Sequence, residues 1–249
     1  CVGDTSEVIP LDFSNDREKM VNYLNTPEFK ESEKHLKLAI VLSKYHQEEL
    51  QKHLSCPVIY IPHPIEGDFQ QWSIKNWNSN KAKSIVQIGV YLRNTQLINQ
   101  IPDIKNVSKL RLWSNMDWAN KYDELVKNFW SSKKRKFFGN STDLFFMPAS
   151  SFDKMLASNV VVMEMFDASA SNGVLDCIIR NTPIIINRHK AVEEYLGADY
   201  PLYFDNPEEI PSLLNKVEEA SEYLSKMDKT KLTPKYFITE LLKACKEKI

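Results

Sequence analysis

One stretch constrains the fold of this chain more than any other: residues 160–187, VVVMEMFDASASNGVLDCIIRNTPIIIN. Its pattern predicts an apolar strand over 160–166, a loop of small polar residues over 167–173, a short helix over 174–181 and a second apolar strand from Pro183. Two strands joined by a helical crossover belong to a parallel sheet. The loop opens a helix at the carboxyl end of a strand, where free N–H groups and the helix dipole favour an anion.

Apolar segments alternate with helical patterns along the rest of the chain. The strand-like segments are 36–43, 58–61, 84–89, 110–113 and 144–147. This alternation predicts an α/β fold, with a Rossmann-like parallel sheet that is covered by helices on both faces. Residues 8–13, VIPLDF, add a possible short strand near the start.

The chain divides into four segments. The segment IPHPIEGDF has the prolines and glycine that are typical of a linker, so we place a boundary near His63. The segments are 1–62, a partial or reduced N-terminal Rossmann-like part; 63–82, the linker; 83–225, the Rossmann-like domain; and 226–249, a C-terminal helix that packs back toward the N-terminal part.

Composition and missing motifs argue against several classes of protein. With 32 basic and 33 acidic residues, the chain has no electrostatic reason to prefer nucleic acid or an anionic membrane as its main partner. No apolar run reaches the roughly 18 residues that span a bilayer, so no integral membrane segment is expected. Neither G-x-G-x-x-G nor a P-loop is present, which argues against hydride transfer and nucleoside triphosphate chemistry. No D-x-D and no His/Asp cluster offers a metal site.

The cysteines indicate the compartment. Cys1, Cys56, Cys177 and Cys245 occur without any C-x-x-C pair. Such spacing is typical of reduced thiols rather than of a zinc site or a disulfide framework. We therefore expect a cytoplasmic protein.

The loop over residues 167–173 carries candidate binding residues. Ser169, Ser171 and Asn172 are small, helix-capping residue types that let a ligand approach backbone amides. Ser171 or Asn172 could equally do no more than cap the helix. Asp176 lies about one turn into the helix, where the dipole already favours an acid. A carboxylate there can also bind both hydroxyls of a ribose attached to a bound phosphate.

Residues from two separate segments carry a family resemblance. They are Gly89, Arg93, Asn94, Ser171, Asn172, Asp176, Thr182 and Pro183. In this order they resemble the nucleotide-binding half of the GT-B glycosyltransferases. The segment NTPIIINRHKAVEEYLG is similar to the end of that half in a group of glycosyltransferases from bacteria and large viruses. The resemblance covers about residues 38–205.

The resemblance implies a site for the nucleoside diphosphate of a sugar donor. Asp176 would bind the ribose, Ser171 and Asn172 would lie at the diphosphate, and the guanidinium of Arg93 would neutralise phosphate charge. Met147 and Pro148 would border the base, or else pack as an ordinary turn. The predicted nucleotide-sugar-binding residues are Gly89, Arg93, Asn94, Met147, Pro148, Ser169, Ser171, Asn172 and Asp176.

The sequence departs from the family pattern in two ways. Many retaining members have a glutamate eight positions before the ribose-binding acid, where this chain has Ala168. Asp167 and Glu164 lie close by, and Asp167 is the candidate catalytic acid, although a turn aspartate would look the same. The second departure is size, since residues 1–62 are too short for a complete acceptor-side domain. That domain is either reduced or has been cut away, and further domains could lie upstream in the parent chain.

These observations predict a metal-independent GT-B glycosyltransferase that moves a sugar from a nucleoside diphosphate sugar to a hydroxyl of a glycan or other acceptor, retaining or inverting its configuration. No cofactor and no nucleic acid are expected. Two alternatives stay open: a noncatalytic nucleotide-sugar-binding domain of a larger protein, and a sugar-nucleotide epimerase of the same fold. Arg188 and His189 also follow an expected strand, but a lone histidine there is more often a surface residue.

Overall fold

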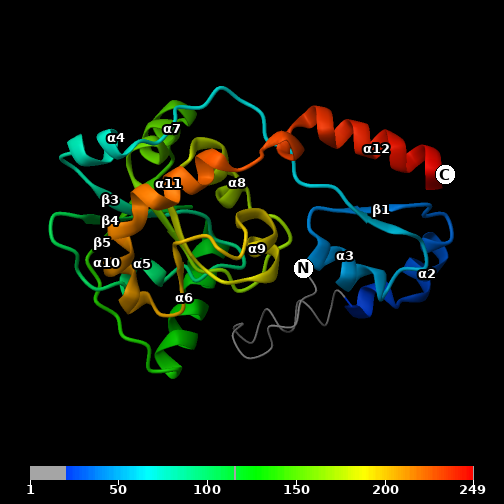
Figure 1. The fold of residues 1–249 in the computed structure, drawn as a ribbon. Coiled ribbons are helices and arrows are strands. Elements are labelled where there is room, and N and C mark those ends of the chain that lie inside the picture. Colours follow the sequence, from blue (N-terminus) through cyan, green and yellow to red (C-terminus); the bar gives the residue numbers. More distant parts are fainter. Residues whose placement is uncertain (1–20, 115, 249) are drawn as a thin grey trace.

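The structure, a computed structural model, describes residues 21–248 except residue 115. The short strand expected at 8–13 lies outside the described residues. Figure 1 shows a larger unit built around a sheet and a smaller unit beside it, with the C-terminal helix lying next to the smaller unit.

Within the described part of the chain, six parallel strands form the sheet of the larger unit, in the order β5-β4-β3-β6-β7-β8. The strands are β3 (Ser84–Gln87), β4 (Ser108–Trp113), β5 (Ser141–Phe145), β6 (Val160–Met163), β7 (Ile184–Asn187) and β8 (Tyr203–Phe204). The chain runs outward from β3 to one edge, returns to pair β6 with β3, and then runs to the other edge. This is the strand order of doubly wound nucleotide-binding sheets, and it confirms the expected Rossmann-like fold.

The central strands are apolar almost throughout because helices cover both of their faces. Val160, Val161 and Val162 of β6 have no exposed surface, and Ile85 of β3 pairs with Val160 in register. The edge strand β5 is more polar, and its Phe145 is half exposed. Burial therefore follows position in the sheet.

Helices α7, α8 and α11 lie on one face of the sheet, and α5 and α6 lie on the other (Figure 1). The helices of the larger unit are α4 (Ile74–Ser79), α5 (Leu97–Gln100), α6 (Asp117–Ser132), α7 (Ala149–Ser158), α8 (Asn172–Arg180), α9 (Lys190–Leu196), α10 (Ile210–Leu213) and α11 (Val217–Lys226). Helix α4 lies within the segment expected as a linker, and the indole of Trp77 anchors it in the core.

The helical segment after β8 is interrupted. Residues 207–223 form the 3-10 turn η1 (Pro207–Glu209), then α10, a second 3-10 turn η2 (Leu214–Lys216), and α11. Pro211 in the first turn of α10 has no N–H to donate, so the hydrogen-bond pattern is not continuous from Pro207 onward.

The smaller unit has a two-stranded parallel sheet, β1 (Ala39–Val41) and β2 (Val58–Tyr60). Its helices are α2 (Pro27–Glu33) and α3 (Lys44–Gln51), and its core is formed by Val41, Leu54, Cys56 and Val58. The C-terminal helix α12 (Pro234–Lys248) follows the 3-10 turn η3 (Thr230–Leu232) and lies beside β2.

Helix α9 of the larger unit holds the smaller unit in place. The carboxylate of Glu194 accepts the backbone N–H groups of Lys44, at 2.6 Å, and Tyr45, at 2.7 Å, at the start of α3. The hydroxyl of Tyr195 donates to the carbonyl of Leu42 and accepts the N–H of His63 at 3.2 Å. The carboxylate satisfies N–H groups that a helix start leaves unpaired, so it stabilises this junction.

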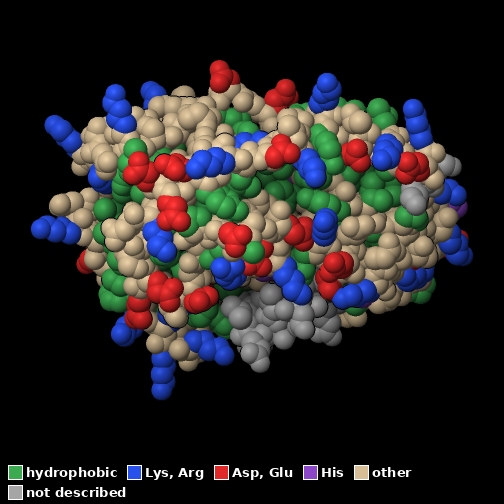
Figure 2. All heavy atoms as spheres, viewed as in Figure 1, with side chains coloured by type: hydrophobic (Ala, Val, Ile, Leu, Met, Phe, Trp, Pro, Cys, Tyr) green, Lys and Arg blue, Asp and Glu red, His purple; other side chains and the backbone are tan. Residues whose placement is uncertain are grey.

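Charged side chains of both signs are interspersed on the face shown in Figure 2. This face therefore presents no large patch of one sign, as the near-zero net charge leads one to expect. None of the helices in the described part of the chain is long and apolar enough to cross a membrane.

Candidate functional site

A cleft of about 490 Å³ opens at the carboxyl ends of β3 and β6, where the strand order reverses. Ligands of doubly wound sheets bind at this position because the loops after the two central strands diverge there. Of the predicted site residues, those that line the cleft are Gly89, Arg93, Asp167, Ser169, Asn172 and Asp176. The structure thus brings together two segments that are about 80 residues apart in the sequence.

Gly89 makes room for Arg93. Its φ is +77°, in the region that favours glycine, and a Cβ atom placed on it would lie 1.4 Å from Nη1 of Arg93. The backbone of Arg93 is held by Tyr122, whose hydroxyl accepts its N–H at 3.1 Å and donates to its carbonyl at 2.9 Å. The guanidinium is therefore placed over the start of the loop after β3.

Ser171 precedes α8 but does not cap it with its side chain. Its hydroxyl instead accepts a hydrogen bond from Nη2 of Arg93 at 2.9 Å. Asn172 begins the helix and lines the cleft. The alternative in which Ser171 serves only as a helix cap is therefore not what the structure shows.

Gly173 allows α8 to approach the sheet closely. A Cβ atom there would lie 2.8 Å from Cε of Met163 in β6 and 3.1 Å from Cδ1 of Ile88 after β3. The start of α8, the positive end of its dipole, is thus held against the switch point of the sheet.

Arg93 is a partly buried cation without a counter-ion in the described part of the chain. Its Nε is buried and has no hydrogen-bond partner there, and none of the ion pairs among these residues involves it. Burial lowers the pKa of the guanidinium from its usual value, although arginine remains charged in proteins. A partly buried, uncompensated positive charge at a cleft favours an anionic ligand.

Asp176 lies in the second turn of α8 and lines the cleft. Its Oδ1 accepts a hydrogen bond from Nη1 of Arg180 at 2.7 Å, and Arg180 also binds Asp153 at 2.6 Å. Burial raises the pKa of Asp176, and the charge of Arg180 opposes this effect. The carboxylate is thus oriented by Arg180 within the cleft wall.

Asp167 is almost fully buried in the loop after β6, although it reaches the cleft. Its Oδ1 accepts the N–H of Ala168 at 2.8 Å and lies 3.2 Å from Nε2 of His189. The side chain of His189 is also buried rather than at the surface, and its Nδ1 accepts the N–H of Ala191 at 3.2 Å as the cap of α9.

Arg188, the residue before His189, does not join this pair. It forms an ion pair with Glu193, at 2.7 Å, and stacks on Tyr203.

The smaller unit contributes one contact to this loop. Nδ1 of His46, in the first turn of α3, lies 2.8 Å from the hydroxyl of Ser169. The sequence analysis missed His46 and Tyr122, since neither lies in a motif. Each joins the site through a contact that spans tens of residues in the sequence, and no local pattern signals it.

Four predicted residues do not line the cleft, and one of them is Ser171, which is buried beside it and contacts Arg93. Asn94 has no exposed surface, and its amide donates to Glu164 at 2.6 Å and to Gln100 at 2.8 Å. Met147 packs partly buried against the core, and Pro148 is the exposed residue before α7. Phe152 of α7 and Leu112 of β4 line the cleft where Met147 and Pro148 were expected to border the base.

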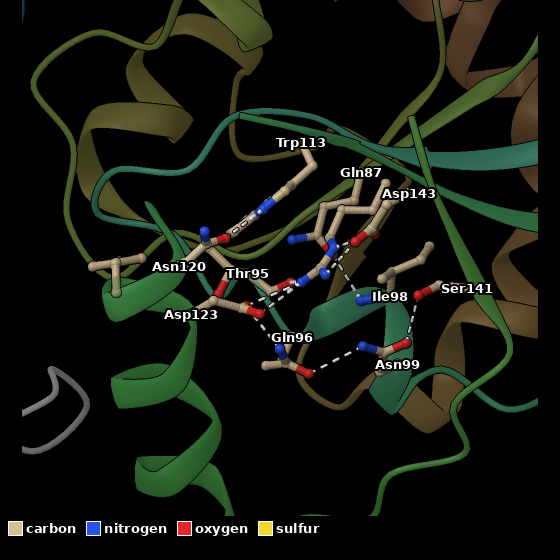
Figure 3. Close-up of polar contacts among 12 residues, drawn as sticks. Gln87, Thr95, Gln96, Ile98, Asn99, Trp113, Asn120, Asp123, Ser141 and Asp143 are labelled. Atoms are coloured by element: carbon tan, nitrogen blue, oxygen red, sulfur yellow. Dashed lines mark hydrogen bonds and ion pairs between the residues drawn. The ribbon is translucent and has the colours of Figure 1, made fainter. Parts of the chain in front are cut away.

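A second arginine fixes the loop that carries Arg93. Arg111 of β4 makes two hydrogen bonds to Asp143, at 2.7 and 2.9 Å, and two to Asp123, at 3.0 and 3.1 Å. Nη1 of Arg111 also donates to the carbonyl of Thr95, and Gln96 donates to Asp123 at 2.7 Å. Figure 3 shows Asp123, Asp143, Thr95 and Gln96 converging in this network. The loop after β3 is therefore anchored two residues beyond Arg93.

No group of three or more His, Cys, Asp or Glu residues within 21–248 could hold a metal ion, residue 115 apart. Cys56, Cys177 and Cys245 are free thiols.

No family model matches the chain. No curated protein matches it either. Solved structures do match. Sucrose-phosphate synthase from Thermosynechococcus elongatus has a TM-score of 0.65 and 9% sequence identity over 99% of this chain and 66% of its own.

Two further structures agree in fold. HepE from Anabaena, solved with UDP and glucose, has a TM-score of 0.61 and 10% identity, with 85% of this chain and 63% of its own covered. WaaG, a glycosyltransferase of lipopolysaccharide biosynthesis, has a TM-score of 0.56 and 12% identity, with 83% and 61% covered. The chain is thus structurally similar to GT-B glycosyltransferases over most of its length and has their Rossmann-like fold. It spans less than two thirds of the length of each of these proteins.

Proposed function

We propose that this chain binds the nucleoside diphosphate part of a sugar donor and belongs to a metal-independent glycosyltransferase. The observation that carries the proposal is Arg93, a partly buried guanidinium without a counter-ion that lies in the switch-point cleft beside the start of α8. A diphosphate would supply the missing negative charge and accept hydrogen bonds from both the guanidinium and the helix start.

The structural neighbours support a sugar nucleotide as the ligand. HepE was solved in complex with UDP-glucose, and WaaG is described as a glycosyltransferase. In our proposal Asp176, which is oriented by Arg180, binds the ribose hydroxyls, and the end of the cleft lined by Leu112 and Phe152 takes the base.

In the proposed reaction an acceptor hydroxyl replaces the diphosphate at the anomeric carbon of the sugar. Negative charge then develops on the leaving diphosphate, where Arg93 and the dipole of α8 stabilise it. Both groups are fixed before the reaction, so they act without a reorganisation cost. Asp167 remains the proposed acid near the transferred sugar, with His189 holding its carboxylate. The free thiols support a cytoplasmic location.

Calorimetric titration with UDP-glucose and GDP-mannose tests the donor site. Arg93→Met removes charge-assisted hydrogen bonding worth about 1.5–3 kcal/mol in total, so nucleotide affinity should fall about 10- to 150-fold. Arg188→Met is the matched control, because Arg188 is an exposed arginine whose partners are Glu193 and Tyr203. Equal affinity of wild type and Arg93→Met would rule out the assignment of Arg93.

A second measurement separates an enzyme from a noncatalytic binding domain. A transferase that holds its donor in this geometry should release UDP or GDP slowly, with water as the acceptor. Nucleoside diphosphate release is measured over hours by a coupled assay on wild type and Arg93→Met. Binding without any release would favour the noncatalytic alternative.

A further inference from the structure

The cleft has two chemically different ends. Leu112, Phe152 and Asp176 line the end on the β4 side of the switch point. Asp167 and Ser169 line the end that faces β7 and the smaller unit. With Arg93 and the start of α8 between them, the proposed function would put the nucleoside of a donor at the first end and its sugar at the second.

The second end contains the carboxylate of Asp167, which has a histidine as its neighbour. Oδ1 of Asp167 lies 3.2 Å from Nε2 of His189. Because Nδ1 of His189 accepts the N–H of Ala191, the ring proton is on Nε2 and is directed to Asp167. The pair thus keeps the single negative charge of the carboxylate.

The remaining groups at this end do not offset that charge. His46 meets Ser169 at 2.8 Å, and burial lowers the pKa of His46 and so favours its neutral form, although the charge of Asp167 opposes this effect. No lysine or arginine within the described chain forms an ion pair with Asp167. The sugar end therefore has a net negative charge, whereas Arg93 makes the centre of the cleft positive.

We propose that the sugar end of the cleft selects a neutral, hydroxyl-rich sugar and excludes sugars that carry a carboxylate, with Asp167 as the specificity-determining residue. This inference rests on the proposed function. A carboxylate oxygen accepts hydrogen bonds from sugar hydroxyls, but it repels a second carboxylate at the same place, and the low solvent exposure of Asp167 limits screening.

Two pairs of donors test the inference: UDP-glucose with UDP-glucuronate, and GDP-mannose with GDP-mannuronate. The members of each pair share the nucleotide and differ at C6, which is a hydroxymethyl group in one and a carboxylate in the other. The protein is titrated with each donor by calorimetry at pH 7.5. In the pair whose nucleotide the protein binds, the neutral donor should bind at least about ten-fold more tightly than the acidic donor.

Asp167→Asn assigns the effect to one residue. The amide oxygen can still accept the N–H groups of Ala168 and His189, but the charge is gone, so the preference for the neutral donor should shrink to within about three-fold. Asp199→Asn is the control, because Asp199 is an exposed acid outside the cleft. An unchanged preference in folded Asp167→Asn would overturn the role of Asp167.

Wild type alone keeps the inference falsifiable if that variant does not fold. Equal affinity for a neutral donor and its acidic counterpart would overturn the inference while leaving the nucleotide site intact. Binding of UDP or GDP but of none of the four donors would do the same. Failure of all six ligands to bind, together with failure of ADP and CDP, would overturn the proposed function itself.

Discussion

Two arginines near the carboxyl edge of one sheet have opposite surroundings. Arg111 is enclosed by the carboxylates of Asp123 and Asp143 and stacks on Trp113. Burial alone would lower the pKa of Arg111, but the hydrogen bonds that Arg111 donates to Asp143 and the charge of Asp123 outweigh it and raise the pKa. For Arg93 burial prevails, and the pKa is lowered.

The difference separates a structural charge from a binding charge. The protein satisfies Arg111 internally, so that arginine stabilises the fold and has nothing left to bind. Arg93 donates to one serine hydroxyl and leaves Nε without a partner in the described structure, at a cleft that opens to solvent. In our proposal a ligand with negative charge pairs with Arg93, as Asp123 and Asp143 pair with Arg111.

The largest expected effect is on stability. Arg111→Met leaves two carboxylates without their cation and should lower the free energy of unfolding by about 3 kcal/mol. Arg93→Met removes an uncompensated, partly buried charge and should leave that free energy unchanged or raise it. Urea denaturation of both variants measures the difference. Equal destabilisation by the two substitutions would contradict the distinction between a paired Arg111 and an unpaired Arg93.

Asp176→Ala should weaken nucleotide binding about 10- to 150-fold, because charge-assisted hydrogen bonding to the ribose worth about 1.5–3 kcal/mol in total is lost. The pKa of Asp176 is raised by burial, so the carboxylate takes up a proton at a higher pH than an ordinary aspartate. Wild-type affinity should therefore fall as the pH is lowered through that raised pKa, with a weaker dependence in Asp176→Ala. Titrations from pH 4.5 to 7.5 measure the nucleotide affinity of both proteins. The same pH dependence in wild type and Asp176→Ala would contradict the assignment of Asp176 to the ribose.

Ser171→Ala should have a smaller effect on binding. It removes the neutral acceptor that orients Arg93, a hydrogen bond worth about 1 kcal/mol, so affinity should fall about five-fold. Ser150→Ala, at the exposed start of α7, is the matched control for titration with the same nucleotide. A loss as large as that of Arg93→Met would mean that Ser171 contacts the ligand directly.

A pH effect is expected in the smaller unit, away from the cleft. Hydrogen bonds from Lys30, at 2.8 Å, and from the backbone of Ser55, at 2.5 Å, lower the pKa of Glu33 from 4.5 to about 2. This carboxylate therefore stabilises the fold fully above pH 4.5 and loses that contribution as the pH falls toward 2. Wild type should have a higher unfolding midpoint than Glu33→Gln above pH 4.5, and the difference should disappear as the pH falls toward 2. A difference that does not vary with pH would contradict the assignment.

The sequence predicted those parts of the fold and site that depend on local pattern. Residues 160–187 have the periodicity of a buried strand, a helix and a second strand, and α8 begins within two residues of the expected position. Arg93 and Ser171 were both singled out, although their direct hydrogen bond joins residues 78 positions apart.

Other features depend on distant partners that no local pattern reveals. Asn94 belongs to a buried network with Glu164, 70 positions away, so its place next to Arg93 in the sequence was misleading. His46 reaches Ser169 across 123 positions. His189 looked like a surface residue until the fold placed it beside Asp167.

Thermal and urea unfolding in the presence of UDP, GDP, ADP and CDP tests the central claim that the cleft binds a nucleoside diphosphate through Arg93. At a hundred times its dissociation constant, the preferred nucleotide should add about 2.7 kcal/mol to the stability of wild type. If Arg93→Met binds about a hundred-fold more weakly, the same concentration should add only about 0.4 kcal/mol. Stabilisation of wild type by none of the four, or equal stabilisation of both proteins, would contradict the account.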